Sequence, residues 1–245
     1  MKHFLSSMII LLLFAACSPF YQVQQVTYAG YRIGTQPTDS AMNVLLKPYS
    51  DSISKSMSAV VVTLANSLEK KQPEGTLGNM MADAMFTMAA EVYGQKPDAA
   101  FMNYGGIRLP SLSAGAITRG KIFELFPFDN ILVLVTIRGE VFQQFLDHIS
   151  GRGGWPVAGM TMKIKNKKAT DVLIGGKKLD PAATYTIALG DYTANGGDDA
   201  YMLVGQPQLN KGYLMRDAIF DYLKLYQQKG VALSVQPENR VLYVD

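Results

Sequence analysis

Two glycine loops carry the side chains in this sequence that could bind a small polar molecule. The first loop runs from Asn103 to Arg108 and the second from Asn195 to Asp198, and each follows a segment that reads as a strand. Paired glycines let the backbone turn tightly and approach a ligand closely. Asn103 and Arg108 offer hydrogen-bond donors to an anion, and Asp198 offers an acceptor for hydroxyls. Together the loops predict a polar small-molecule site, although each loop alone could be an ordinary turn with solvated charges.

Two aromatic segments could add a stacking surface to these loops. Phe126, Pro127 and Phe128 lie at a helix-to-strand junction, and Tyr192 lies just before the second loop. Pro127 turns the chain, so we expect one of the two phenylalanines to stay near the surface. Stacking of an exposed ring on a planar base is worth about 1–3 kcal/mol in nucleic-acid complexes. The alternative is that both phenylalanines pack in the core.

The residues needed for several common reaction centres are missing from the sequence. His148 is the only histidine after His3, and Cys17 is the only cysteine, so a transition-metal site of His and Cys ligands is not indicated. A lone histidine such as His148 is more typical of a surface or satisfied residue than of a catalytic one. The sequence contains neither a Gly-x-Ser-x-Gly elbow nor a Walker-type phosphate loop. We therefore name no catalytic residue and no metal ligand.

Composition is that of a folded domain that does not bind nucleic acid. Apolar residues make up 48% and charged residues 18% of the chain, with a net charge of +3. The one basic run, which resembles an exposed strand or turn and lacks interleaved aromatics, comprises Lys163, Lys165, Lys167 and Lys168. The length after the leader suits one domain over residues 30–245.

The N-terminus reads as a secretory signal that ends at a lipidation site. A short basic start precedes an apolar run from Met8 to Phe14, which is too short to span a bilayer as a stable helix. Cys17 follows two alanines, as in bacterial lipoproteins. We predict a signal peptide over residues 1–16, lipidation of Cys17 and a tether over residues 17–29, the alternative being a free thiol at an ordinary cleavage site. The expected location is the cell envelope, lipid-anchored at the outer membrane and facing the periplasm.

Hydrophobic periodicity predicts a layered α+β domain with a mixed sheet, in preference to a doubly wound parallel sheet. Helices are predicted over 40–56, 76–93, 118–126, 140–150 and 215–228. Strands are predicted over 57–64, 98–102, 131–137, 155–163, 172–174, 184–189 and 241–244, with a first short strand within 18–38. Thr76 and Thr118 are predicted helix caps, and Gly230 is predicted to end the last helix. The strand over 57–64 is expected to be buried at its three central valines.

Taken in order, several motifs resemble the C-terminal domain of the 5′-nucleotidase family over residues 30–244. The landmarks are Glu74 to Asn79 with Ala82 to Met85, Asn103 to Arg108, Gly115 to Thr118, Phe126 to Asn130, Gly139, Val157 to Gly159, and Asn195 to Asp198. In that family this domain recognises the nucleotide.

The resemblance implies a role for each candidate site residue. Asn103 and Arg108 would meet the phosphate or ribose, Phe128 and Tyr192 would sandwich the base, and Asp198 would hold the ribose hydroxyls. Lys71 falls where the family usually has a phosphate-binding arginine, and a lysine there keeps the charge but loses the bidentate fork. Tyr192 replaces a frequent phenylalanine and keeps a stacking face. Tyr104 replaces a glycine and narrows the first loop.

In the family, hydrolysis is performed by a separate N-terminal calcineurin-like domain that carries two metals. The residues that precede residue 30 are too few to form such a domain. We therefore expect no cofactor in this chain, and we expect divalent metals only in a separate metallophosphatase that would act with it on a nucleotide or nucleoside. Two alternatives remain: a nucleoside- or nucleotide-binding lipoprotein without catalysis, and a structural lipoprotein that has lost the ligand, which Lys71 and Tyr104 favour.

Overall fold

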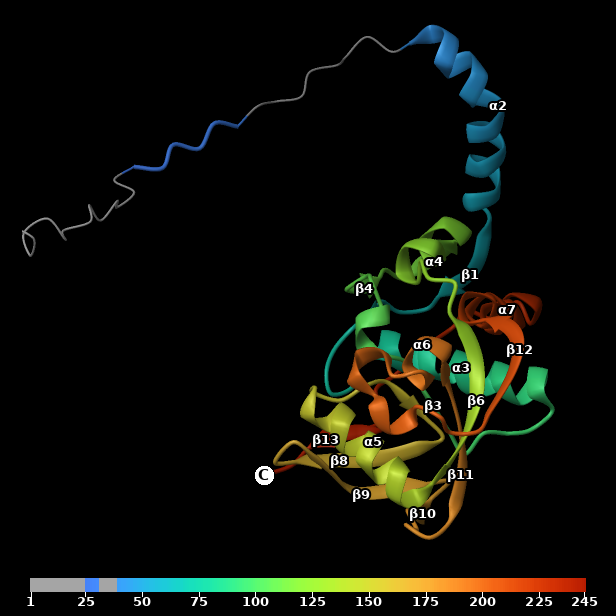
Figure 1. Ribbon diagram of the computed structural model, residues 1–245. Coiled ribbons are helices and arrows are strands. Elements are labelled where there is room, and N and C mark those ends of the chain that lie inside the picture. Colours follow the sequence, from blue (N-terminus) through green and yellow to red (C-terminus); the bar gives the residue numbers. More distant parts are fainter. Residues whose placement is uncertain (1–24, 31–38) are drawn as a thin grey trace, which may run out of the picture. The chain divides into compact units, whose positions relative to one another are not determined.

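A five-stranded mixed sheet positions the candidate site. The computed structural model describes residues 25–30 and 39–245 of the chain (Figure 1). The strand order is β12 (Gln208–Leu214), β6 (Ile131–Arg138), β11 (Thr184–Gly190), β3 (Ala99–Phe101) and β7 (Val157–Ala158). Strand β11 runs antiparallel to β6 and parallel to β3, so the carboxyl ends of β11 and β3 lie at the same edge. Both glycine loops leave the sheet at this edge.

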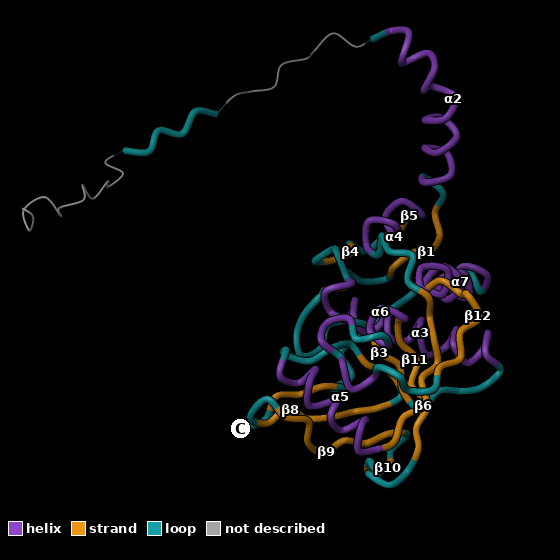
Figure 2. The backbone as a smooth tube through the Cα atoms, viewed as in Figure 1, coloured by secondary structure: helices purple, strands orange, loops and turns teal. Residues whose placement is uncertain are grey.

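The remaining strands of the described residues form three smaller sheets (Figure 2). The four-stranded sheet has the order β10 (Lys177–Lys178), β9 (Lys168–Ile174), β8 (Met160–Lys165) and β13 (Val241–Tyr243). The two-stranded sheets pair β1 (Val60–Leu64) with β5 (Gly115–Thr118), and β2 (Leu68–Glu69) with β4 (Ser111–Leu112). The predicted basic run lies on the β8–β9 hairpin, whose turn residues Asn166 and Lys167 both have positive φ.

Helices cover both faces of the five-stranded sheet. Leu132 and Leu134 of β6 share one core cluster with α3 (Thr76–Tyr93) and α7 (Met215–Gln228). Val133 and Val135, which point to the other face, share a second cluster with α5 (Gly139–Gly151) and the four-stranded sheet. Burial on both faces explains why β6 reads as a continuous apolar run and not as an alternating one. The predicted layered α+β fold with mixed sheets is confirmed.

The first predicted buried strand is shorter and more exposed than expected. Strand β1 begins at Val60, whose side chain is 46% exposed, whereas Val62 and Leu64 are buried. The pairing of β1 with β5 shifts register between Val60 and Val62, so Val60 falls outside the alternation that buries Val62 and Leu64. The prediction of a strand buried at all three valines was wrong.

Two of the three predicted helix-end residues are confirmed. The Thr118 hydroxyl accepts a hydrogen bond from the Lys121 N–H at 3.3 Å and caps α4 (Arg119–Leu125). Gly230, at φ +65°, follows the end of α7 and lets the Val231 N–H bond back to the Tyr226 carbonyl. Thr76 is not a cap. The N-cap position of α3 is taken by Gly75, and the Thr76 hydroxyl accepts from the Glu69 N–H at 2.9 Å.

The predicted strand over 155–163 is two strands that belong to different sheets. Gly159 has φ +78° and breaks the segment between β7 and β8. Strand β7 joins β3 in the five-stranded sheet, and β8 joins β9 and β13 in the four-stranded sheet. Strand β9 is correspondingly longer than the predicted 172–174, because its first residues pair with the end of β8.

The chain divides into two compact units, residues 1–45 and residues 46–245. Helix α2 (Ser40–Met57) crosses this division and confirms the helix predicted over 40–56. Four apolar side chains of this helix, those of Met42, Leu45, Leu46 and Tyr49, are exposed. The signal peptide over residues 1–16, the lipidation of Cys17 and most of the predicted tether and first strand lie outside the described residues.

Candidate functional site

The first glycine loop presents Asn103 and Arg108 from the end of β3. Residues Tyr104–Gly106 form one 3₁₀ turn, and the Arg108 guanidinium donates to the Gly105 carbonyl at 3.3 Å. Gly106 packs against Asn103 so closely that a Cβ there would lie 2.5 Å from the Asn103 amide oxygen. Glycine at this position therefore keeps the Asn103 side chain in place.

The second glycine loop presents Asp198 and the ring of Tyr192 from the end of β11. Tyr192 lies on the short helix α6 (Asp191–Ala194), and its hydroxyl accepts from the Asp198 N–H at 3.3 Å. A Cβ on Gly197 would lie 2.5 Å from the Tyr192 ring, so only glycine allows the ring to lie flat against this backbone. Asp198 itself has φ +51°, a left-handed conformation that aspartate tolerates better than most residues.

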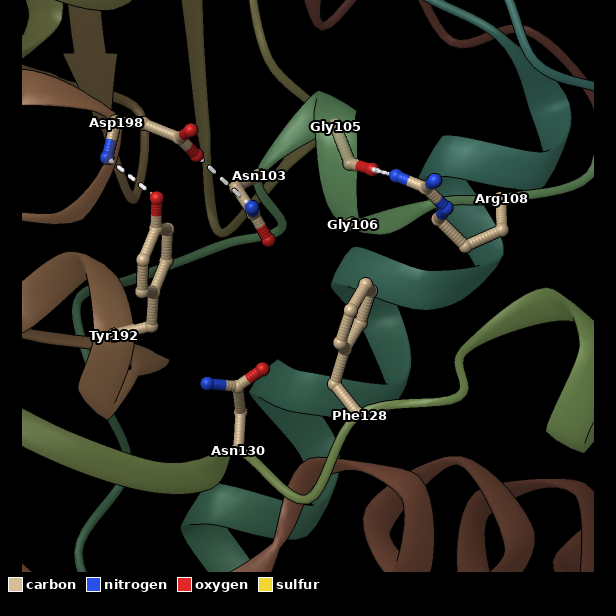
Figure 3. A pocket seen from close by; sticks show the side chains of 8 residues that line it. All are labelled: Asn103, Gly105, Gly106, Arg108, Phe128, Asn130, Tyr192 and Asp198. Carbon is tan, nitrogen blue, oxygen red and sulfur yellow. Dashed lines mark hydrogen bonds between the residues drawn. The ribbon is translucent and has the colours of Figure 1, made fainter.

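The two loops meet at one cavity. The Asn103 amide donates to the Asp198 carboxylate at 3.0 Å, although the two residues are far apart in the sequence. This contact follows from the parallel pairing of β3 and β11, which places both loops at one sheet edge. The cavity has a volume of about 410 Å³ and is lined by Asn103, Gly105, Gly106, Arg108, Phe128, Asn130, Tyr192 and Asp198 (Figure 3). This volume lies within the usual range of small-molecule sites, about 300–1,000 Å³.

Two aromatic rings face the cavity from different elements. Phe126 is 1% exposed and belongs to the core, whereas Phe128 is 38% exposed and Tyr192 is 51% exposed. The two phenylalanine rings are in T-shaped contact, with centroids 5.5 Å apart. The expectation that one phenylalanine stays near the surface is confirmed. Figure 3 shows Phe128 and Tyr192 on opposite sides of the cavity, with Asn130 between their segments.

The cation beside the first loop is Lys70, and Lys71 does not line the cavity. The Lys70 N–H donates to the Pro110 carbonyl at 2.8 Å, and its ammonium donates to the Ile107 carbonyl, also at 2.8 Å. The ammonium lies 4.1 Å from the centroid of the Tyr104 ring. Burial, together with the positive charge of Arg108, lowers the pKa of Lys70. Lys71, the predicted phosphate residue, is exposed to solvent.

Helix α5 and the residue that follows it contact the second glycine loop. His148 Nε2 lies 2.8 Å from the Asp198 carbonyl oxygen, and Arg152 forms an ion pair with Asp199. Hydrogen bonds from Tyr201 and Arg152 lower the pKa of the Asp199 carboxyl. These contacts make His148 a satisfied, half-buried residue that holds the loop, as the sequence favoured.

The cavity offers three kinds of interaction. The aromatic rings can stack on a planar group, the Asn103–Asp198 pair can bond hydroxyls, and the Arg108 guanidinium can bind an anion. Within residues 25–30 and 39–245, no three His, Cys, Asp or Glu side chains are grouped so that they could hold a metal ion. In the same residues no helix is both long and apolar enough to cross a membrane.

Sequence reasoning did not single out two residues that lie in or beside the site. Asn130 was noted only as the end of an aromatic segment, yet its side chain lines the cavity. Lys70 does not line the cavity, but its ammonium lies beside the first loop, where it bonds to the Ile107 carbonyl. The signal that could have found Lys70 is strand alternation: Leu68 is buried, so Lys70 is in phase with an inward position.

The fold and the cavity define a class of protein, an α+β domain with a ligand-sized cavity where two parallel strands end. The particular family follows from the sequence. Residues 56–205 match the family model described as the 5′-nucleotidase, C-terminal domain, and the chain belongs to this family.

Individual relatives agree with this assignment. A 5′-nucleotidase of Vibrio cholerae is 31% identical over 200 residues, covering 76% of this chain and 34% of its own length. Protein UshA of Escherichia coli is 32% identical over 163 residues, covering 63% of this chain and 29% of its own length. The crystal structure of a 5′-nucleotidase precursor from Thermus thermophilus superposes with a TM-score of 0.71 at 24% identity, covering 85% of this chain and 44% of that one, and shows the shared fold. The chain thus spans about a third of the length of the curated relatives it matches.

Proposed function

We propose that the cavity binds a nucleotide or nucleoside, with the base between Phe128 and Tyr192. The observation that carries the proposal is the pair of half-exposed rings on opposite sides of a ligand-sized cavity. Leaving two large rings partly in water forgoes hydrophobic burial, and a planar base inserted between them would restore that burial on both faces. Membership of the 5′-nucleotidase C-terminal family supports a nucleotide as the ligand.

The ribose would lie against the Asn103–Asp198 pair. The Asp198 carboxylate accepts one bond from Asn103 at 3.0 Å, which leaves further acceptor positions for two sugar hydroxyls. The Asn103 bond also fixes the direction in which the carboxylate points. Because Asp198 lines the cavity beside Tyr192, the hydroxyls would reach it while the base is stacked.

The phosphate would lie toward Arg108 and Lys70. Arg108 lines the cavity, and its guanidinium carbon lies 5.8 Å from the centroid of the Phe128 ring. Burial and, after it, the positive charge of Arg108 lower the pKa of Lys70, so the two like charges disfavour each other. An anionic phosphate placed between them would turn this repulsion into attraction for both cations.

Calorimetry with adenosine and AMP tests the proposal directly. We expect the protein to bind both ligands with dissociation constants below about 1 mM, and AMP more tightly than adenosine because only AMP carries the phosphate. Inosine, a nucleoside with a different purine base, tests the contribution of the base. Ribose 5-phosphate, which has no base, tests the contribution of the sugar phosphate. If neither adenosine nor AMP binds at millimolar concentration, the proposed binding of a base between Phe128 and Tyr192 is ruled out.

Hydrolysis of the nucleotide would need a second protein, a calcineurin-like metallophosphatase that docks on this domain. The proposal is supported by the match to about a third of the length of proteins named 5′-nucleotidase. We expect the purified chain to release no phosphate from AMP in the presence of Mn²⁺ or Zn²⁺, and to support release once the metallophosphatase is added. Metal-dependent turnover by the chain alone, in a preparation free of other phosphatases, would contradict this.

We further propose that the protein is lipid-anchored through Cys17, at the outer membrane and facing the periplasm. The support is the small-residue sequence before Cys17 and the short apolar run before it. Replacing Cys17 with serine should move the protein from the membrane fraction to the soluble fraction of fractionated cells. A serine variant that stays with the membranes would contradict the anchor.

A further inference from the structure

One carboxylate oxygen joins the segments that carry the two aromatic rings. Asp191 is the first residue of α6 and directly precedes Tyr192. Its Oδ1 accepts from the Tyr192 N–H at 2.8 Å and from the Ile131 N–H at 3.0 Å. The same oxygen accepts from the Asn130 side-chain amide at 3.2 Å. Asp191 thereby connects the start of β6 to the start of α6.

This connection forms a short path between the rings. Asn130 follows Phe128 by two residues, and Tyr192 follows Asp191 directly. The path from one ring to the other therefore runs through a few covalent bonds and the hydrogen bonds of Asp191. Rigid elements continue on both sides, because Ile131 begins β6 and Asp191 follows the last residue of β11. A change at Asp191 would therefore alter the distance between the two rings directly.

Helix α7 contacts the backbone of the segment that carries Phe128. Arg216 is only 9% exposed, and its guanidinium donates to the Phe128 carbonyl at 3.0 Å and forms an ion pair with Asp129. The guanidinium carbon lies 4.4 Å from the centroid of the Phe123 ring. The Met215 N–H also donates to the Asn130 carbonyl at 2.8 Å. The segment that carries Phe128 is thus fixed to α7 by backbone and side-chain contacts.

We propose that Asp191 is a positioning residue that sets the gap between Phe128 and Tyr192, and that Arg216 fixes the Phe128 side of the gap. This inference rests on the proposed function, because the gap matters only if a base enters it. Carbon atoms attract best at about 3.5–4.0 Å, and a gap wider by about 0.5–1 Å on one side loses about a quarter to a half of that attraction. Asp191 would act through the geometry of the rings and would not contact the ligand.

A double-mutant cycle with adenosine tests whether Asp191 acts through the rings. In the otherwise unchanged protein, Asp191→Ala should weaken adenosine binding about five- to tenfold. In the Phe128→Ala background the same change should cost less than about twofold, because one ring is already gone. Asp191→Asn keeps an acceptor oxygen and should bind adenosine nearly as well as the unchanged protein.

Asp147→Ala is the matched control for a lost carboxylate. Asp147 also accepts hydrogen bonds from three residues, Gln143, Ala169 and Lys168, but it joins α5 to β9 and does not line the cavity. The Asp147→Ala variant should leave the affinity for adenosine unchanged. If Asp191→Ala does not fold, Arg216→Lys provides a second test, because lysine keeps the positive charge but loses the planar guanidinium. Arg216→Lys should weaken adenosine binding about threefold, again only when Phe128 is present.

The outcomes separate the two proposals. If the unchanged protein binds neither adenosine nor AMP, the proposed function fails and the positioning role of Asp191 fails with it. If the unchanged protein binds, but Asp191→Ala and Phe128→Ala have additive effects, the positioning role alone is overturned. An equal loss of affinity in Asp147→Ala would overturn it as well. Non-additive effects with rescue by Asp191→Asn support it.

Discussion

Replacing either Phe128 or Tyr192 with alanine should weaken the binding of adenosine and AMP by about tenfold or more. Each ring would cover one face of the base, and stacking of a base on an aromatic side chain is worth about 1–3 kcal/mol, where about 1.4 kcal/mol is a factor of ten. Both ligands should lose the same factor, because the base is common to them. Isothermal titration calorimetry measures both losses directly.

Two variants separate stacking from other effects of these changes. Tyr192→Phe keeps the ring and loses the hydroxyl that accepts from the Asp198 N–H, so it should bind adenosine almost as tightly as the unchanged protein. Tyr243→Ala removes a similarly exposed tyrosine that does not line the cavity and should leave the affinity unchanged. If Tyr192→Ala has no effect on adenosine while Phe128→Ala does, the base is not held between two rings.

Lys70→Gln should weaken the binding of AMP by about tenfold, and Lys71→Gln should leave it unchanged. The ammonium of Lys70 lies near Arg108, whereas Lys71 faces solvent. A hydrogen bond to a charged group is worth about 1.5–3 kcal/mol, which is consistent with a loss of this size. Adenosine, which has no phosphate, should bind equally well to both variants. The neighbouring lysines form a pair matched in charge and side chain.

The lowered pKa of Lys70 adds a pH-dependent test. Burial and Arg108 disfavour the charged ammonium in the free protein, so its pKa lies below the ordinary value of 10.5. A bound phosphate favours the charged form and raises this pKa again. In alkaline buffer, AMP binding should therefore be accompanied by proton uptake, which calorimetry in buffers of different ionisation enthalpy detects. Lys70→Gln should abolish the uptake, and an unchanged uptake would place the phosphate elsewhere.

The strongest local patterns in the sequence were enough to place most of the helices and strands. The apolar spacing of α5 and the continuous apolar run of β6 each require burial of the same side chains whatever the rest of the chain does. The two glycine loops, and the exposure of one of the two phenylalanines near Pro127, followed from residue types alone. Prediction was weaker where burial depends on pairing, as at Val60 of β1.

Adjacent residues could not be told apart without the tertiary contacts of their strand. Lys70 and Lys71 have identical side chains, and only the bond from the Lys70 N–H to the Pro110 carbonyl, far along the chain, distinguishes their positions relative to the first loop. The same holds for Thr76, whose hydroxyl bonds back to Glu69 and does not cap α3. Such contacts join segments whose separation in the sequence leaves no local signal.

By itself the sequence determined which groups are available for binding in this protein. They are two glycine loops, two aromatic rings, an amide, a guanidinium and a carboxylate. Only the tertiary structure decided that these groups share one cavity. The parallel pairing of β3 with β11 brings Asn103 to 3.0 Å from Asp198, and Asp191 joins the segments of the two rings. The physical reason is that residue types set which interactions are possible, whereas the long-range pairing of strands sets which of them meet.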